Sequence, residues 1–267
     1  MSLNYNSSYY ITLMILHKLL SKTAQIKWIP KWISLLGWFQ YFKLLTSKTS
    51  KKNYLTLKLN DYNQTIYLRP NTSDYKIFKQ IFIEEEYNVH YPDHVNTIVD
   101  AGSNCGYSVV YFKNKFKNAK LIAIEPDRSN IEMIKKNTSG IKNIHIVKGG
   151  IWDINTDLKI LDKNAGKWAF RVVEASDNTK EFKGYSLEAI MLEHDLKTID
   201  ILKMDIEGSE KKVFEQNYQY WLSKTTFGFL ELHETYAPGV TDLVHLRLRT
   251  FNFDISKSGE NVVYSKR

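Results

Sequence analysis

The sequence predicts an α/β protein with a Rossmann-like parallel sheet that has helices on both faces. From residue 97 onward, short apolar runs alternate with segments of helical periodicity. One run ends at Asp100 and is followed by a turn that contains Gly102 and Gly106, while the next run ends at Glu125. This arrangement is typical of a βαβ unit that binds a nucleotide. The same residues therefore predict both a fold class and a cofactor site.

Each element of this fold has a pattern of its own in the sequence. The expected strands of the sheet are residues 97–100, 121–124, 144–147, 201–205 and 227–232. The expected helices are 107–116 and 129–136, the second of which opens with a capping box from Ser129 to Glu132. Two antiparallel additions are expected, an insertion of 158–161 with 169–173 and a closing hairpin of 251–255 with 261–264. Upstream, apolar and polar residues alternate within 54–59 and 64–68, which predicts a small hairpin. Residues 75–85 have helical periodicity.

Length and composition are those of a folded globular protein. The 267 residues are 43% hydrophobic and 13% aromatic, which excludes a disordered chain. The lone cysteine, Cys105, excludes an intramolecular disulfide and favours a reducing compartment, so we expect a cytoplasmic protein. We expect two domains, a basic amphipathic helical segment at 1–53 and a catalytic domain at 54–267.

The positive charge of the chain lies at its N-terminus. Residues 1–60 contain nine lysines and no acid, and subtracting them from the net charge of +8 leaves −1 for the remainder. Five apolar residues recur there at helical spacing, so we expect them on one face: Trp28, Trp32, Leu35, Phe39 and Phe42. Such a helix can lie in an anionic membrane interface, and a subdomain packed on the core or a homodimer arm is an equal alternative. Nucleic acid is a weaker candidate, because the rest of the chain is nearly neutral. No run reaches the ~18–20 apolar residues needed to span a bilayer.

The spacing of the glycine turn narrows the choice of cofactor. A dinucleotide site needs G-x-G-x-x-G, whereas this turn reads Asp-x-Gly-x-x-x-Gly from Asp100 to Gly106. A carboxylate there repels a phosphate and suits a ligand with a positive charge. S-adenosylmethionine carries a sulfonium and an amino group, and Glu125 is placed to accept both ribose hydroxyls. The alternative is an ordinary α/β turn in which the glycines only permit tight backbone geometry.

An ordered series of motifs between residues 69 and 239 resembles the FkbM-type S-adenosylmethionine-dependent methyltransferases. The series is Arg69-Pro70-Asn71-Thr72-Ser73-Asp74-Tyr75, Glu86-Tyr87, Val99-Asp100-Ala101-Gly102-Ser103-Asn104-Cys105-Gly106, Ile124-Glu125-Pro126-Asp127, Gly150-Ile151-Trp152-Asp153, Trp168-Ala169-Phe170-Arg171-Val172, Leu202-Lys203-Met204-Asp205-Ile206-Glu207-Gly208-Ser209-Glu210 and Glu231-Leu232-His233. The resemblance implies a class I methyltransferase sheet and O-methylation, often of sugar hydroxyls. Ser103 and Cys105 stand where an alanine and an aliphatic residue are commoner, and residues 1–60 lie outside the resemblance.

A set of residues around the predicted strand ends is expected to bind the cofactor: Arg69, Asp100, Ala101, Gly102, Ser103, Asn104, Gly106, Tyr107, Glu125, Pro126, Gly150, Ile151, Trp152 and Asp205. Ile151 and Trp152 are placed to flank the adenine, with a core tryptophan as the alternative. Arg69 is a candidate for the methionine carboxylate or an acidic substrate, although an arginine after a strand is usually a solvated surface residue.

Catalysis needs a group that removes the proton of the acceptor alcohol, or a metal that acidifies it. Four residues at the carboxyl ends of the strands at 201–205 and 227–232 are the expected catalytic set: His233, Asp205, Glu207 and Glu231. We expect His233 to be the general base, because imidazole titrates nearest to neutral pH, and Asp205 to orient the cofactor or the acceptor. A lone histidine is more often structural, and Glu207 with Glu210 can also be read as first-turn helix acids. A divalent ion held by these residues ranks below acid–base catalysis, and we predict no metal.

The sequence thus predicts an S-adenosylmethionine-dependent O-methyltransferase that acts on a sugar hydroxyl of a glycan, glycolipid or related metabolite. Trp168 and Arg171 form either part of the acceptor pocket or a structural hairpin. The alternatives are a nucleic-acid methyltransferase and a non-catalytic cofactor-binding scaffold at a membrane surface.

Overall fold

The computed structural model describes residues 26–46, 53–62, 64–160, 172–176 and 179–267. The chain divides into two compact units, Met1–Pro70 and Asn71–Arg267. The N-terminal hairpin belongs to the first unit, whereas the sequence analysis assigns it to the domain that begins at residue 54.

The first unit consists of helix α2 (Ile29–Thr46) and the antiparallel strands β1 (Leu55–Lys58) and β2 (Thr65–Leu68), which form the expected hairpin. The single apolar face predicted from Trp28 to Phe42 is wrong. Trp32 is buried, whereas Phe39 and Phe42 are exposed, because the helix is kinked at Gly37, where φ is 70°. Among the described residues, no helix is both long and apolar enough to cross a membrane.

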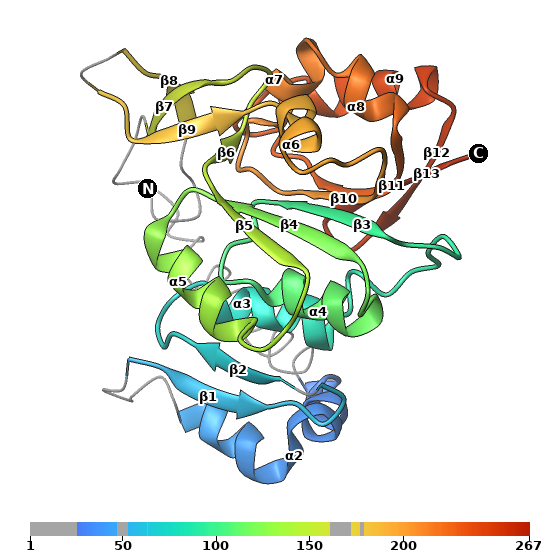
Figure 1. The fold of residues 1–267 in the computed structure, drawn as a ribbon. Coiled ribbons are helices and arrows are strands. Elements are labelled where there is room, and N and C mark those ends of the chain that lie inside the picture. The colour runs from blue at the N-terminus through green and yellow to red at the C-terminus, as the bar shows by residue number, and fades with distance from the viewer. Residues whose placement is uncertain (1–25, 47–52, 63, 161–171, 177–178) are drawn as a thin grey trace, which may run out of the picture. The chain divides into compact units, whose positions relative to one another are not determined.

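The second unit is built on a seven-stranded sheet with the order β12-β13-β11-β10-β3-β4-β5 (Figure 1). Its five parallel strands are β3 (Thr97–Ala101), β4 (Lys120–Glu125), β5 (Ile144–Lys148), β10 (Ile199–Met204) and β11 (Thr225–Glu231). The hairpin of β12 (Phe253–Ser258) and β13 (Asn261–Lys266) closes one edge and pairs antiparallel with β11, as expected. Chain order reverses between β3 and β10, which places the ligand crevice of such a fold at their carboxyl ends. The predicted fold class is confirmed.

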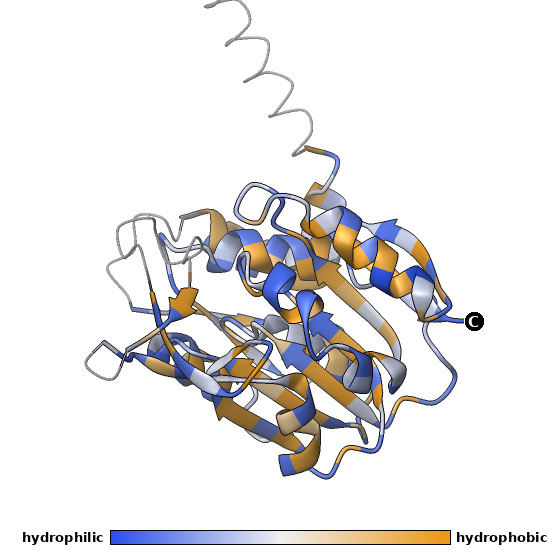
Figure 2. Cartoon of the chain, turned by 90° about the horizontal axis from the view of Figure 1, so that it is seen from above, coloured by the Kyte–Doolittle hydropathy of each residue, from blue (hydrophilic) through white to orange (hydrophobic). Residues whose placement is uncertain are grey.

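Helices cover both faces of this sheet (Figure 1). One face carries α3 (Asp74–Phe78), α4 (Tyr107–Lys115) and α5 (Arg128–Asn137). The other carries α6 (Leu187–Glu193), α7 (Glu210–Glu215), α8 (Gln219–Ser223) and α9 (Val240–Thr250). Val99 and Ile124 of the central strands pack with Phe214, Trp221 and other helical residues in one buried cluster. Figure 2 shows that hydrophobic residues follow the central strands, as two-sided burial requires.

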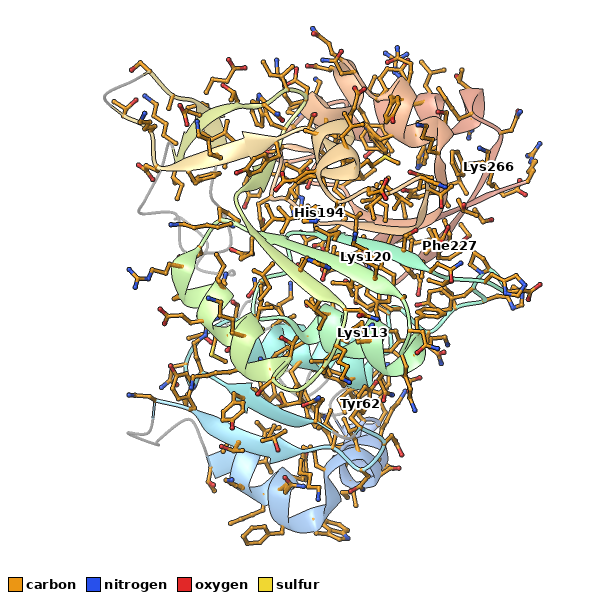
Figure 3. All side chains as sticks on the ribbon, in the orientation of Figure 1. Tyr62, Lys113, Lys120, His194, Phe227 and Lys266 are labelled. Carbon is orange, nitrogen blue, oxygen red and sulfur yellow. The ribbon has the colours of Figure 1, made fainter. Side chains whose placement is uncertain are left out.

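Two helices differ from the helices that the sequence predicts. The capping box from Ser129 is wrong, because Asp127 is the N-cap of α5 and accepts a hydrogen bond from the Asn130 amide at 2.9 Å. The helix expected at 75–85 is α3 followed by a π-helical turn, η2 (Lys79–Ile83). At the end of α4, the buried Lys113 donates to the carbonyls of Lys117 and Ala119 and so satisfies backbone acceptors (Figure 3).

An insertion after β5 forms a second sheet with the order β6-β9-β7-β8. Its strands are β6 (Gly150–Ile151), β7 (Thr156–Ile160), β8 (Val172–Glu174) and β9 (Phe182–Tyr185). The antiparallel pairing of β7 with β8 confirms the small insertion, and β6 and β9 enlarge it. Trp168 and Arg171 lie outside the described residues, so their role stays a prediction.

Candidate active site

The two glycines of the turn after β3 have different purposes. A Cβ on Gly102, where φ is 78°, would lie 1.8 Å from the backbone oxygen of Asp205. The turn therefore passes directly against the carboxyl end of β10. Gly106 is the N-cap of α4, and a Cβ there would lie 3.0 Å from the Cα of Ile134 in α5. Gly102 thus shapes the crevice, whereas Gly106 allows two helices to pack closely.

Asp100 is held inside the protein by a buried ion pair. Its Oδ1 lies 3.3 Å from Nζ of Lys203, and its Oδ2 accepts a hydrogen bond from Ser108 at 2.6 Å. Asp100 is 0% exposed and Lys203 is 3% exposed. Burial alone lowers the pKa of Lys203, but the charge of Asp100 and other acidic neighbours raises it overall, so the lysine stays charged. The geometry does not support the predicted contact of Asp100 with the cofactor, because its carboxylate faces Lys203 and Ser108 instead.

Lys203 is a residue that the sequence analysis does not identify, although it stands in one of the quoted motifs. Its ammonium group also donates to the carbonyl of Gly102 and lies 3.9 Å from Oδ2 of Asp205. It therefore joins the glycine turn to the end of β10. No sequence signal could have revealed this, because Lys203 lies in an apolar strand that is far from Gly102 in the chain.

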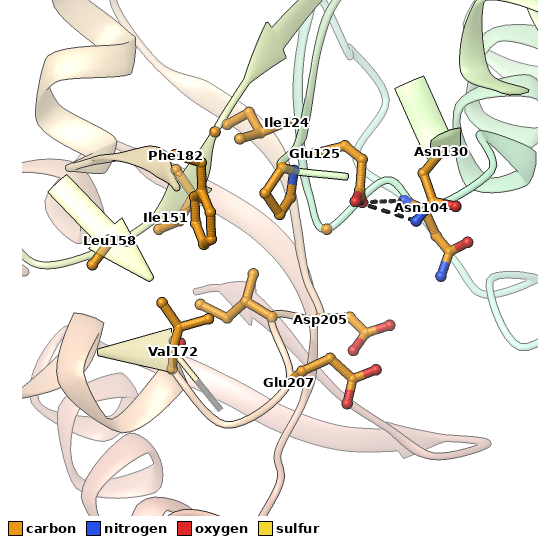
Figure 4. A pocket seen from close by; sticks show the side chains of 16 residues that line it. Asn104, Ile124, Glu125, Asn130, Ile151, Leu158, Val172, Phe182, Asp205 and Glu207 are labelled. Carbon is orange, nitrogen blue, oxygen red and sulfur yellow. Dashed lines mark hydrogen bonds between the residues drawn. The ribbon is translucent and has the colours of Figure 1, made fainter. Parts of the chain in front are cut away.

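Glu125, at the end of β4, is pre-positioned by three hydrogen bonds. Its carboxylate accepts from the amide of Asn104 at 2.9 Å and the side chain of Asn130 at 3.2 Å (Figure 4), and also from the amide of Asp127 at 2.9 Å. Burial raises the pKa of Glu125, and these hydrogen bonds oppose the rise. The side chain is only 6% exposed and lines a pocket. Glu125 thus lies where the sequence analysis expects a carboxylate that binds ribose.

This pocket lies at the carboxyl ends of β3, β4 and β10. Its described lining consists of Gly102, Asn104, Ile124, Glu125, Pro126, Asn130, Gly149, Gly150, Ile151, Leu158, Val172, Phe182, Asp205, Ile206, Glu207 and Ser209. Seven of the residues predicted to bind the cofactor are among them: Gly102, Asn104, Glu125, Pro126, Gly150, Ile151 and Asp205. Glu207, predicted as catalytic, lines it as well.

The other predicted cofactor residues do not line the pocket. Asp100, Ala101 and Gly106 are not among the lining residues, and Arg69 belongs to the first unit. Ser103 is buried and donates to the backbone of Asp100 at 2.8 Å. Tyr107 is fully buried and packs against the rings of Phe78 and Phe82. Trp152 is 7% exposed and donates to Glu174 at 3.3 Å, which favours its alternative reading as a core tryptophan.

One wall of the pocket is apolar and comes largely from the insertion. Leu158, Val172 and Phe182 of β7, β8 and β9 line it together with Ile151 of β6 (Figure 4). A Cβ on Gly150 would lie 3.1 Å from the ring of Phe182, so this ring packs over the strand end. Of this wall, only Ile151 is predicted from the sequence, because the pairing of β9 with β7 is not apparent from the order of apolar and polar residues.

The pocket suits S-adenosylmethionine by the chemistry of its lining. The apolar wall fits the adenine, and Glu125 fits the ribose hydroxyls. Within the described part of the chain, Oδ1 of Asn104 and Oδ1 of Asp205 are buried and have no hydrogen-bond partner. Both are acceptors, and an amino group supplies the donors that they lack. The residues present therefore fit this cofactor.

An acid–histidine cluster, formed by Asp205, Glu207, Glu210, Glu231 and His233, lies at the ends of β10 and β11. Oε1 of Glu210 contacts Nδ1 of His233 at 2.9 Å and accepts from the amide of Ile206 at 3.0 Å. Nε2 of the imidazole lies 3.4 Å from Glu207, 3.8 Å from Asp205 and 3.8 Å from Glu231. The structure brings together all four residues that the sequence predicts as catalytic.

Glu210 orients the imidazole of this cluster. Glu210 is the first residue of α7 and is 0% exposed. It is therefore a first-turn helix acid, as the alternative interpretation predicts, and it also contacts His233. Glu207 has a φ of 56°, which is costly for a residue with a Cβ and is often found at functional sites. Glu234, the other acid beside His233, does not join the cluster and instead accepts from the amides of Gly239 and Thr241 at the start of α9.

Three members of the cluster have raised pKa values. Burial lowers the pKa of His233, but the hydrogen bond and charge of Glu210, with the charges of Asp205 and Glu207, raise it to about 9. Burial and the charge of Asp205 raise the pKa of Glu207 to about 7 and that of Glu231 to about 8. His233 is therefore protonated at neutral pH, which argues against the predicted general base. Ligand atoms of Asp205, Glu231 and His233 lie within 4.8 Å of one another, so the cluster also has the composition of a divalent-cation site.

Comparison with known proteins identifies the family of the chain. Residues 100–253 match the model of the methyltransferase FkbM domain. Methyltransferase 1 of Beauveria bassiana (strain ARSEF 2860) is 28% identical over 165 residues, which are 51% of this chain and 64% of that protein, so the match spans less than two thirds of the relative.

Two solved structures also resemble the chain. The fibrillarin pre-rRNA processing protein of Methanococcus jannaschii aligns at 10% identity and a TM-score of 0.45, covering 81% of this chain and 84% of that one. A putative caffeoyl-CoA O-methyltransferase from Staphylococcus aureus aligns at 13% identity and a TM-score of 0.41, covering 73% and 93%. Because the family model matches more than half of its length, the chain belongs to the methyltransferase FkbM domain family, whose members use S-adenosylmethionine.

Proposed function

We propose that the chain transfers a methyl group from S-adenosylmethionine to a hydroxyl group of a sugar in a glycan, glycolipid or related metabolite. One observation carries this proposal. Asp205 and Glu207 line the cofactor pocket and also belong to the acid–histidine cluster. Cofactor binding and proton removal thus share one edge of the sheet.

The residues of the pocket bind and orient the cofactor, which supplies an electrophilic methyl group on its sulfonium when bound. Glu125 accepts from the ribose hydroxyls, and Oδ1 of Asn104 and of Asp205, which have no hydrogen-bond partner among the described residues, accept from the amino group. The apolar wall that includes Phe182 packs against the adenine. Much of the catalysis comes from holding the donor and the acceptor oxygen at attack distance.

The acceptor hydroxyl loses its proton to the acid–histidine cluster, with Glu207 as the first proton acceptor. Glu207 is the member that both lines the pocket and has a pKa of about 7, which suits a general base near neutral pH. The imidazolium of His233, held by Glu210, stabilises the ionised form of Glu207 across 3.4 Å. His233 therefore acts as a positioning and charge-stabilising residue in this proposal.

A base of this kind supports O-methylation, because an alcohol must be deprotonated whereas a carboxylate is already an anion at neutral pH. The sugar as acceptor comes from the resemblance of the motifs to FkbM-type enzymes. The name of the relative from Beauveria bassiana gives no acceptor, so the substrate class is open to direct test.

The test is transfer of an isotopic methyl group into a cell extract. We expect label in a glycan or glycolipid fraction that survives mild alkali, because a methyl ether is stable where a methyl ester is hydrolysed. Glu207→Gln abolishes the transfer while calorimetry still detects S-adenosylmethionine binding, and Glu215→Gln, an exposed acid at the end of α7, serves as the matched control. Label that alkali releases, or label that a nuclease releases, would contradict the proposal.

A further inference from the structure

Helix α2 changes the side that it buries part-way along its length. Its first half buries Trp32, Leu35 and Leu36. At Gly37 the backbone has φ 70° and ψ 161°, a conformation that is essentially restricted to glycine. A Cβ at Gly37 would meet no atom within 4 Å, so glycine is needed for the backbone angle and not for space. Beyond Gly37 the helix resumes with a different side facing solvent.

The second half of α2 turns Gln40 and Lys43 inward beside the buried Leu44. Gln40 exchanges two hydrogen bonds of 2.6 Å with the backbone of Lys58 in β1, and Lys43 donates to the carbonyl of Thr56 at 2.9 Å. Four large apolar side chains on the opposite side form an aromatic face, with exposed fractions of 72% for Trp38, 83% for Phe39, 67% for Phe42 and 51% for Leu45. This half of the helix buries Leu44 but leaves these four side chains exposed, whereas a helix in a water-soluble domain buries its apolar side.

The aromatic face stands out from the rest of the described surface. Five of the nine exposed large hydrophobic residues of the described chain lie between Ile26 and Leu45, and the other four are scattered. Single exposed apolar residues are normal, whereas a contiguous patch marks an interaction site. The hydrogen bonds to β1 hold the helix with this patch outward, so its exposure is a built feature of the first unit.

We infer that the aromatic face inserts into the interface of an anionic lipid bilayer. Residues 1–60 contain nine lysines and no acid, so the segment that carries the face is complementary to a negatively charged surface. The same charge opposes pairing of this face with a second copy of the chain. At the start of the segment, Nζ of Lys27 lies 4.9 Å and Nζ of Lys31 5.8 Å from the ring centroid of Trp28. This end of the segment therefore combines positive charge with a tryptophan. Aromatic residues with lysines at their margin are typical of helices that lie in a membrane interface.

The experiment is co-sedimentation of the full chain with vesicles of phosphatidylglycerol and phosphatidylcholine. We expect binding that weakens with salt and is much lower on pure phosphatidylcholine. A variant with Trp38→Ser, Phe39→Ser and Phe42→Ser loses at least tenfold in partition coefficient. The matched control carries Ile154→Ser, Leu192→Ser and Leu246→Ser, three exposed apolar residues of the second unit, and binds like the native chain.

Two results would overturn the inference. One is equal vesicle binding by the aromatic-face variant and the native chain. The other is a native dimer, seen by light scattering, that dissociates in this variant while neither protein binds vesicles. Calorimetry of S-adenosylmethionine binding is run in parallel, because an unchanged affinity in both variants separates membrane docking from the proposed methyl transfer.

Discussion

Gly102 allows the closest backbone approach at the site, and its replacement gives a prediction that the structure makes quantitative. Gly102→Ala places a Cβ at 1.8 Å from the backbone oxygen of Asp205, well inside any real contact. Gly140→Ala is the matched control, because Gly140 has a φ of 82° against 78° for Gly102 and a Cβ there meets no atom within 4 Å. The two substitutions share the cost of a left-handed alanine and differ only in the clash.

The left-handed conformation costs alanine about 1–2 kcal/mol, and this is the whole expected loss for Gly140→Ala. Overpacking a rigid site adds about 1–3 kcal/mol, so Gly102→Ala should lose about 2–5 kcal/mol of unfolding free energy. Urea denaturation monitored by fluorescence measures both values. Equal losses in the two variants would refute the close approach of the turn to β10.

The same clash has a functional consequence at Asp205. Relief of the 1.8 Å contact moves either the glycine turn or the end of β10, and residues of both line the cofactor pocket. We expect Gly102→Ala to bind S-adenosylmethionine at least tenfold more weakly, which is about 1.4 kcal/mol, and Gly140→Ala to bind it normally. Calorimetry at a temperature where both variants are folded makes the comparison. Unchanged affinity in Gly102→Ala would show that the pocket does not depend on this contact.

Four further predictions follow from the charged groups. Lys203→Met leaves the carboxylate of Asp100 buried without its cation and lowers the unfolding free energy by about 3–5 kcal/mol, and adding Asp100→Asn recovers part of the loss in urea denaturation. The ratio kcat/KM rises with pH through about 7 as Glu207 ionises, and a pH profile of Glu207→Gln lacks this limb. His233 has a folded-state pKa of about 9 against 6.5 unfolded, so its stabilising contribution is complete below pH 6.5 and lost as the pH rises to about 9. The melting temperature should therefore fall over this range, and fall less in His233→Gln. Because Glu207 removes the proton in this proposal, we expect dialysis against a chelator to leave methyl transfer unchanged. Activity that is lost on dialysis and restored by magnesium or manganese would instead assign a cation to the acid–histidine cluster.

The parallel sheet could be predicted because each of its strands contains a short run that is mainly apolar. Burial on both faces requires such runs, and the acids at their ends mark the edge where the site forms. Glu125 is the last residue of β4 and His233 lies two residues after the end of β11, so their positions come from the strand pattern alone. The same reasoning places Asp205 after β10, where it lines the pocket.

Other parts of the site depend on contacts between segments that are distant in the chain. Asp100 has the sequence position of a ligand-binding acid, but Lys203 of β10 neutralises it in the core. The apolar wall requires β9 to pair with β7 across the insertion. The residues of such short strands do not indicate which strand will be the partner. In the first unit, one φ angle at Gly37 changes the exposed side of α2, and a periodicity count assumes a continuous helix.

The acid–histidine cluster shows why a residue type does not decide a catalytic role. Histidine is the usual choice of base because its unperturbed pKa is near neutral, but here four carboxylates surround one imidazole. Their charges keep His233 protonated, while burial and the charge of Asp205 raise the pKa values of Glu207 and Glu231 into the range expected of a base. The pKa values of His233, Glu207 and Glu231 therefore depend on the charges of their neighbours, and removal of one charge shifts them. His233→Gln should lower proton-accepting activity by raising the pKa of Glu207, so that part of the lost rate returns at higher pH, whereas the loss of a true imidazole base would not be recovered.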